Sequence, residues 1–154
     1  GSFDHADPTL IDYARRRLGP KCKFTHVPSE QVGELYHMAD LMAHCALFEA
    51  FGLVIVEGAS TGLPVLTHNA PHFQWLLPNS ACWVDMSAPG VLAERITALM
   101  REPALREGLR SAEQIIERYD WRNLKAGYRA LFKQVAHGPL GTWNSTRRHH
   151  VAIA

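Results

Sequence analysis

Residues 40–64 constrain the fold of this chain more than any other stretch, because an apolar run there lies between two carboxylates. Residues 50–56 separate Glu49 from Glu57, and the run ends at Thr61-Gly62. Gly62 suits the left-handed backbone position that commonly follows the last turn of a helix. The pattern therefore predicts a helix from about Phe51 to Thr61, followed by a short strand over 63–67.

Local propensity alone favours a different structure for the centre of this run. Three of the four residues in 53–56 are β-branched, which is typical of a buried strand. However, residues 41–47 already form a strand candidate just upstream. Two successive strands would leave no crossover connection for a parallel sheet, so we predict a helix here.

Short apolar strands alternate with helical segments through the first two thirds of the chain. The helix candidates are 9–18, 30–39 with Ser29 as N-cap, and 71–77; the strand candidates are 23–27, 41–47, 63–67 and 81–86. This alternation predicts an α/β fold, a Rossmann-like parallel sheet with helices on both faces.

The last third of the chain has helical periodicity throughout. It predicts helices over 91–101, 104–118 and 121–136, with Asp120 capping the third and Gly138-Pro139 ending it. We therefore expect a helical C-terminal extension. Residues 1–2 look like a cloning scar, 3–138 form one domain, and 139–154 are expected to be a loosely ordered tail.

Composition excludes several functional classes. Apolar residues make up 47% and charged residues 20%, as in ordinary soluble domains, and a net charge of +1 gives no electrostatic case for nucleic acid. The cysteines Cys22, Cys45 and Cys82 are too far apart for a typical zinc or disulfide framework. No apolar run approaches the roughly 20 residues of a membrane helix, and no signal-peptide pattern is present, so we expect a cytoplasmic location.

The stretch 40–64 resembles the donor-binding motif of retaining glycosyltransferases of family 4, which have the GT-B fold. Residues 35–40 resemble the Leu-Tyr-x-x-Ala-Asp motif of that family, and 119–121 resemble the Phe-Ser-Trp that opens its last helix. The resemblance covers roughly residues 10–135. It implies one half of a GT-B fold, the C-terminal domain that binds a nucleotide sugar.

The resemblance implies a role for each carboxylate. Glu49 would face the donor sugar, where a carboxylate can stabilise the oxocarbenium character of the transition state. Glu57 would hold the ribose hydroxyls, because a carboxylate is purely an acceptor. A nucleoside-diphosphate sugar would be a substrate, with no cofactor, and the absence of an Asp-x-Asp cluster predicts no metal site.

Further donor contacts are expected around the helix N-terminus. The turn Phe51-Gly52-Leu53 would present backbone N–H groups to the diphosphate. His26 stands in a turn that often contacts the base, where glycine is common in the family. Asn69 lies in a strand-to-helix loop and would contact the sugar or a phosphate.

The family has two Rossmann-like domains with the active site between them, and this chain matches only the second. The resemblance therefore implies a missing N-terminal, acceptor-binding half, through which any peripheral membrane contact would run. The Arg and Lys that bind the diphosphate in the family also have no counterpart here. The isolated chain is expected to be inactive.

Other interpretations stay open from the sequence. Glu57 could be a solvent-facing helix residue, and Glu49 could simply complement the helix dipole. The whole chain could be a non-catalytic doubly wound module that binds a ligand or partner, or part of a related GT-B sugar-nucleotide epimerase. The donor sugar, base, acceptor, pathway and oligomeric state are not determined by the sequence.

Overall fold

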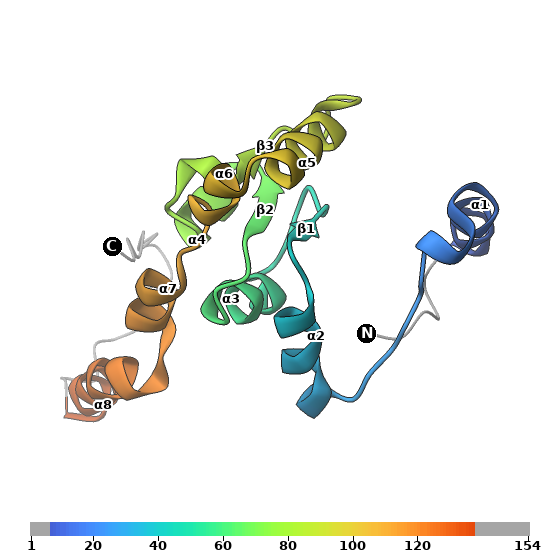
Figure 1. Cartoon of the computed structure of the whole chain (residues 1–154). Helices are drawn as coiled ribbons and strands as arrows, with labels where there is room; N and C mark the ends of the chain where they lie inside the picture. Colours follow the sequence, from blue (N-terminus) through green and yellow to red (C-terminus); the bar gives the residue numbers. More distant parts are fainter. Residues whose placement is uncertain (1–6, 138–154) are drawn as a thin grey trace, which may run out of the picture.

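The structure, a computed structural model, describes residues 7–137 (Figure 1). The interpretations of 1–2 as a scar, 138–139 as a helix end and 139–154 as a tail lie outside these residues. The elements are α1 (Pro8–Leu18), η2 (Gly19–Lys21), η3 (Ser29–Gln31), α2 (Val32–Met38), β1 (Met42–His44), α3 (Leu53–Ser60), β2 (Val65–His68), α4 (Pro71–Leu76), η4 (Ser80–Cys82), β3 (Trp83–Val84), α5 (Val91–Arg101), α6 (Pro103–Glu107), α7 (Ala112–Tyr119) and α8 (Trp121–His137).

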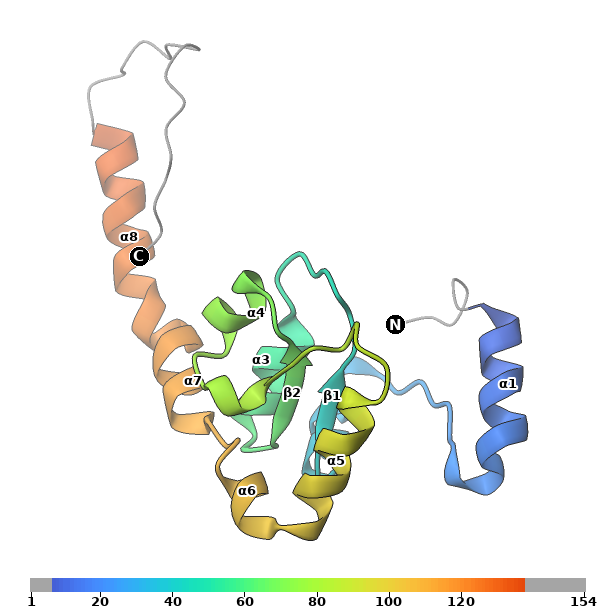
Figure 2. The ribbon, with the colours of Figure 1, turned by 90° about the horizontal axis from the view of Figure 1, so that it is seen from above.

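Within the described residues the sheet has three parallel strands in the order β1-β2-β3. Met42 pairs with Val65 and His44 with Thr67 between β1 and β2, while Thr67 pairs with Trp83 across to β3. Helix α5 lies in front of the sheet and α3 behind it in Figure 2, and Figure 1 shows the same separation. The predicted Rossmann-like α/β fold is confirmed.

Residues 53–56 form the first half of α3, so the helical interpretation of this run is confirmed. Two left-handed glycines bound the helix. Gly52 is its N-cap with φ 88°, and Gly62 follows its end with φ 82° and donates its N–H to Ala59 O at 3.0 Å. The two glycines thus let the chain enter and leave α3 sharply, which propensity at 53–56 could not reveal.

The strand predicted over 23–27 is wrong. This segment has no regular secondary structure, and it pairs with no strand among the described residues. A strand is defined by the ladder it forms with a neighbour, and β1 pairs only with β2 on the described part of the sheet. An apolar, β-branched pattern cannot by itself supply that neighbour.

The single helix predicted over 104–118 is also wrong, since α6 ends at Glu107 and α7 begins at Ala112. The break turns Leu109 into the core, where it is 1% exposed. Burying this side chain stabilises the folded state by roughly 1.5–3 kcal/mol relative to leaving it in solvent, which favours the break between the two helices.

The two predicted N-caps have different outcomes. Ser29 is wrong as a cap for 30–39, because it begins the 3-10 turn η3 and its hydroxyl donates to Glu30 Oε2 at 3.0 Å. Asp120 is confirmed, because its Oδ1 accepts the Arg122 N–H at 2.7 Å and thereby satisfies a donor in the first turn of α8.

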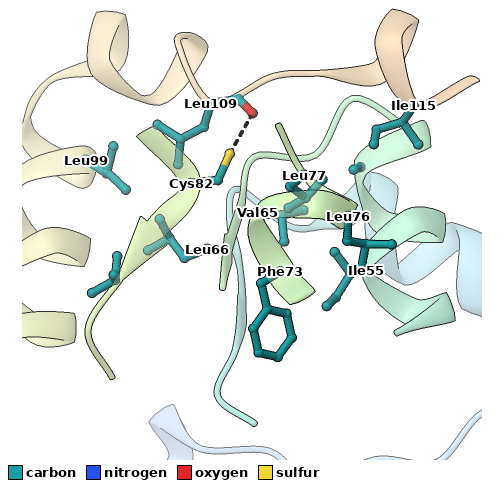
Figure 3. Close-up of a cluster of buried hydrophobic side chains, with 12 residues drawn as sticks. Ile55, Val65, Leu66, Phe73, Leu76, Leu77, Cys82, Leu99, Leu109 and Ile115 are labelled. Carbon is teal, nitrogen blue, oxygen red and sulfur yellow. Dashed lines mark hydrogen bonds between the residues drawn. The ribbon is translucent and has the colours of Figure 1, made fainter. Parts of the chain in front are cut away.

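The core lies around β2, and α3, α4, β3, α5 and α7 each contribute side chains to it (Figure 3). Cys82 is fully buried, and its thiol donates to Leu109 O at 3.6 Å, the dashed line in Figure 3. Burial raises the pKa of this thiol to about 11, so it is protonated at neutral pH. The buried cluster is Ile55, Ala59, Val65, Leu66, Phe73, Leu76, Leu77, Cys82, Val84, Leu99, Leu109 and Ile115.

Candidate functional site

The carboxyl ends of the three strands define one edge of the sheet, where open α/β folds place their ligands. Strand β1 ends at His44, β2 at His68 and β3 at Val84. The loop after β1 carries Glu49, and the loop after β2 carries Asn69. The fold therefore brings two of the predicted site residues to this edge, together with two histidines.

Both carboxylate oxygens of Glu49 have a neighbour. Oε1 accepts the N–H of Ala50 at 2.9 Å, and Oε2 lies 3.4 Å from Nε2 of His44. The Glu49 side chain is 29% exposed, so it is held by its surroundings and still reachable from solvent. A carboxylate held this way can accept from a ligand hydroxyl or face a developing positive charge.

Gly52 is fixed by its backbone and by packing. A Cβ at this position would lie 2.9 Å from Ile55 Cδ1 and 3.2 Å from Glu49 Cγ, and the φ of 88° already disfavours a side chain. The sequence argument for this turn rested on backbone N–H groups presented to a diphosphate. The structure adds that Gly52 lets the loop carrying Glu49 pack directly against α3.

Phe51 and Leu53 flank Gly52 at the start of α3. The Phe51 ring packs edge-on against Trp75 and Tyr119, at centroid distances of 6.3 and 6.0 Å. The Phe51 carbonyl accepts from Nε2 of His72 at 3.1 Å, which ties this loop to α4. Leu53 is 64% exposed on the first turn, beside the backbone N–H groups that helix geometry leaves without intrahelical partners.

Glu57 is exposed on α3, and its Oε2 accepts from the hydroxyl of Tyr36 on α2 at 3.1 Å. Burial raises the pKa of Tyr36 to about 12, and the hydrogen bond to the negative Glu57 adds to the shift. The tyrosine is therefore a stable donor that orients the carboxylate. Glu57 also borders a hollow between α3 and α7 that is lined by Ser60, Ile116 and Tyr119.

The loop after β2 is organised by hydrogen bonds to β3 and α4. Nδ1 of His68 accepts the N–H of Met86 at 3.2 Å, which leaves Nε2 as the protonated nitrogen of the neutral ring. The Asn69 N–H donates to Val84 O at 3.0 Å, and its Oδ1 accepts from Gln74 at 2.9 Å. Asn69 is thus a fixed polar group on the exposed side of this edge.

His26 is a predicted site residue that lies outside the loops that follow the strands. It is exposed on the segment between η2 and η3, before the sheet begins. Figure 1 shows this segment leading from α1 to α2, whereas Glu49 and Asn69 lie in the loops after β1 and β2.

Three residues that contact the predicted site were missed from the sequence: His44, His72 and Tyr36. His44 ends β1, and its position immediately before the loop with Glu49 was the available signal. The contacts of Tyr36 and His72 join separate elements, so no local spacing could predict them.

The described residues contain no group of three or more His, Cys, Asp or Glu side chains arranged to hold a metal ion. In the same residues, no helix combines the length and apolar character required to cross a bilayer.

The sequence is similar to that of known proteins over most of the chain. Residues 12–116 match the family described as glycosyl transferases group 1. The chain is 30% identical over 141 residues to a D-inositol 3-phosphate glycosyltransferase of Corynebacterium urealyticum, covering 87% of this chain and 32% of that protein. It is 30% identical over 91 residues to a phosphatidyl-myo-inositol mannosyltransferase of Mycobacterium leprae, covering 57% of this chain and 24% of that protein.

The fold is also similar to that of sucrose-phosphate synthase from Thermosynechococcus elongatus. The TM-score is 0.75 at 21% identity, over 84% of this chain and 34% of that chain. The chain spans about a third of the length of the first relative and of this structure. With the family match extending over residues 12–116, the chain belongs to the group 1 glycosyltransferases.

Proposed function

We propose that this chain is the donor-binding domain of a retaining glycosyltransferase, which binds a nucleoside-diphosphate sugar and transfers its sugar to a glycan, lipid or small-molecule acceptor. The observation that supports this most is the arrangement around α3: a half-buried, anchored Glu49 precedes the helix, and Glu57 lies on its second turn. The names of two relatives, which specify inositol 3-phosphate and phosphatidyl-myo-inositol, support small-molecule and lipid acceptors as classes.

In this proposal each part of the donor meets different chemistry. The diphosphate lies at the N-terminus of α3, near Phe51, Gly52 and Leu53, where helix N–H groups and the dipole favour negative charge. Glu49 faces the sugar and stabilises positive charge at the anomeric carbon. Glu57, oriented by Tyr36, accepts from the ribose diol. Asn69 and His26 are further proposed donor contacts, to the sugar and to the base.

The proposed domain spans residues 3–138 and works with a second domain that binds the acceptor. Orienting two reactants contributes about 7–11 kcal/mol to catalysis in favourable cases, and this contribution requires the acceptor-binding half. We therefore expect the 154-residue chain to transfer no sugar by itself. Membrane contact, where it occurs, is proposed for the N-terminal, acceptor-binding half. The enzyme is proposed to be cytoplasmic and to use no cofactor.

Calorimetric titration of UDP and GDP into the chain tests the role of Glu57. Glu57→Ala removes a charged hydrogen-bond acceptor, so nucleotide affinity should fall by roughly 1.5–3 kcal/mol. Glu94→Ala, an exposed glutamate on α5, is the matched control and should leave affinity unchanged. An affinity unchanged by Glu57→Ala, in a folded variant, would return Glu57 to the role of a solvent-facing residue.

A transfer assay with the purified chain and a donor–acceptor mixture tests whether catalysis needs the acceptor-binding half. We expect no product above background. Turnover by the 154-residue chain at a rate of about 1 per second, ordinary for enzymes, would place the acceptor site within these residues and contradict the proposal.

A further inference from the structure

His44 ends β1 with its ring nitrogen enclosed by protein. Nε2 of His44 is buried and has no hydrogen-bond partner of good geometry among the described residues. The carboxylate of Glu49 lies beside it, with Oε2 3.4 Å away. A buried N–H without a partner costs free energy of folding. The Glu49 carboxylate is the group that can offset this cost for the His44 ring.

Packing alone does not explain a histidine at this position. The ring lies 6.0 Å from that of Phe73, centroid to centroid, in a tilted arrangement that an apolar side chain could also provide. His72 likewise packs on Phe73, at 5.4 Å, but its Nε2 donates to the Phe51 carbonyl. The two rings therefore share an apolar neighbour and differ in the polar group that each one faces.

The edge around His44 has a second buried polar atom without a partner. Thr67 is fully buried, its Oγ1 has no hydrogen-bond partner among the described residues, and it pairs in register with His44 on the neighbouring strand. Side chains at paired positions of parallel strands lie on the same face of the sheet. Two buried polar side chains thus lie together at His44, where apolar side chains would cost less free energy.

From these contacts we infer that His44 is a positioning residue that holds the carboxylate of Glu49 in place for the donor sugar. That a donor sugar binds here rests on the proposed function above. Oε1 of Glu49 is fixed by the Ala50 N–H, and His44 faces the other oxygen. A carboxylate can only accept, so the neutral ring must carry its proton on Nε2. With a donor group beside each oxygen, the orientation of the carboxylate is restrained.

The contact itself is tested without any ligand. Two-bond ¹H–¹⁵N spectra of the histidine rings at pH 8 should show the Nε2–H form of His44, and Glu49→Gln should move the His44 Nε2 resonance. His37, exposed on α2, is the control and should not move. A His44 resonance that is the same in the two proteins would overturn the inference.

The functional half is tested by comparing UDP with UDP-glucose and GDP with GDP-mannose as calorimetric titrants of the chain. His44→Leu keeps an apolar group against Phe73 and should reduce affinity for the preferred nucleotide sugar by about tenfold, leaving its nucleoside diphosphate unaffected. His44→Gln carries an amide N–H at comparable reach and should restore most of the loss. Thermal midpoints of both variants establish that each is folded.

The outcomes separate the inference from the proposed function. Equal losses for sugar and diphosphate ligands, or wild-type affinity in His44→Leu, would overturn the role of His44 and leave donor binding standing. Failure of the wild-type chain to prefer either nucleotide sugar over its diphosphate would overturn donor-sugar binding by the chain and, with it, the role of His44 in that binding. The ring spectra would still decide whether the His44–Glu49 contact exists.

Discussion

The body of the domain, from β1 to α7, and the two outer helices, α1 and α8, all carry large apolar side chains, but these side chains lie in opposite environments. Phe73 and Leu66 in the body are 1% and 0% exposed. Tyr13 on α1 is 59% exposed and Phe132 on α8 is 66% exposed. Figures 1 and 2 show α1 and α8 standing away from the sheet on different sides. Periodicity therefore determines that a segment is helical, and a partner surface determines whether it is buried.

The outer helices depend on local devices where the body depends on packing. The Asp7 side chain accepts the Thr9 N–H at 2.8 Å at the start of α1, and Pro8 occupies the first helical position. Asp120 caps α8 and pairs with Arg122. Such caps contribute about 1 kcal/mol each, less than one well-buried core side chain.

The largest expected effect comes from truncating the body. Phe73→Ala should lower the free energy of unfolding by about 3–5 kcal/mol, because it leaves a cavity among fully buried side chains. Phe132→Ala on α8 removes the same atoms from an exposed site and should change it by less than about 0.5 kcal/mol. Urea denaturation followed by circular dichroism measures both. Similar losses for the two variants would show that α8 packs against a surface as the body does.

The second prediction compares two left-handed N-caps. Gly52 and Gly90 have φ of 88° and 87°, but a Cβ at Gly52 would meet Ile55 at 2.9 Å, whereas nothing lies within 4 Å at Gly90. Gly90→Ala should cost about 1–2 kcal/mol from its backbone alone.

Gly52→Ala should cost more than Gly90→Ala, because steric overlap adds to the same backbone penalty. It should also displace Glu49, whose Cγ lies 3.2 Å from the added atom. Chemical denaturation of both variants gives the comparison. Equal costs would mean that the loop before α3 yields easily and does not fix Glu49.

The sequence predicted the elements that have their own start and stop signals. The predicted helix over 91–101 coincides with α5, and Gly62, together with the need for a crossover after 41–47, decided correctly for a helix at 53–56. It failed at 23–27 and 104–118, where the outcome depended on a neighbouring strand and on burial of Leu109. Both depend on contacts with distant parts of the chain, which a short stretch of sequence does not contain.

The candidate site divides in a similar way. Glu49 and Glu57 were identified by resemblance to a family motif, and the structure gives each one a ring-bearing neighbour, His44 and Tyr36 respectively. The position of His44 just before the loop was a signal for the first contact, whereas the contact of Tyr36 depends on how α2 and α3 are placed. The assigned roles of the site residues stay predictions that ligand titrations must test.

The smallest expected effect concerns pH and the local device that begins α8. Hydrogen bonds from the Arg122 guanidinium, 2.6 Å from Asp120 Oδ2, and from the Arg122 backbone N–H lower the pKa of Asp120 to about 2. Because this pKa lies below the ordinary value near 4, ionised Asp120 stabilises the folded state above pH 4. That contribution is lost as the pH falls from about 4 to about 2.

Asp120→Asn keeps a side chain that can cap the helix and removes the charge. Its thermal midpoint should therefore lie slightly below that of the wild type between pH 5 and 7, and the two should converge as the pH approaches 2. Added salt should narrow the gap at neutral pH, since the pair is near the surface. Asp12→Asn on α1, whose carboxylate is 3.7 Å from Arg15, is the control and should show a smaller gap. A difference in thermal midpoint between Asp120→Asn and the wild type that is constant from pH 7 to 2 would assign the effect to capping geometry. The charge pair would then contribute no stability at the start of α8.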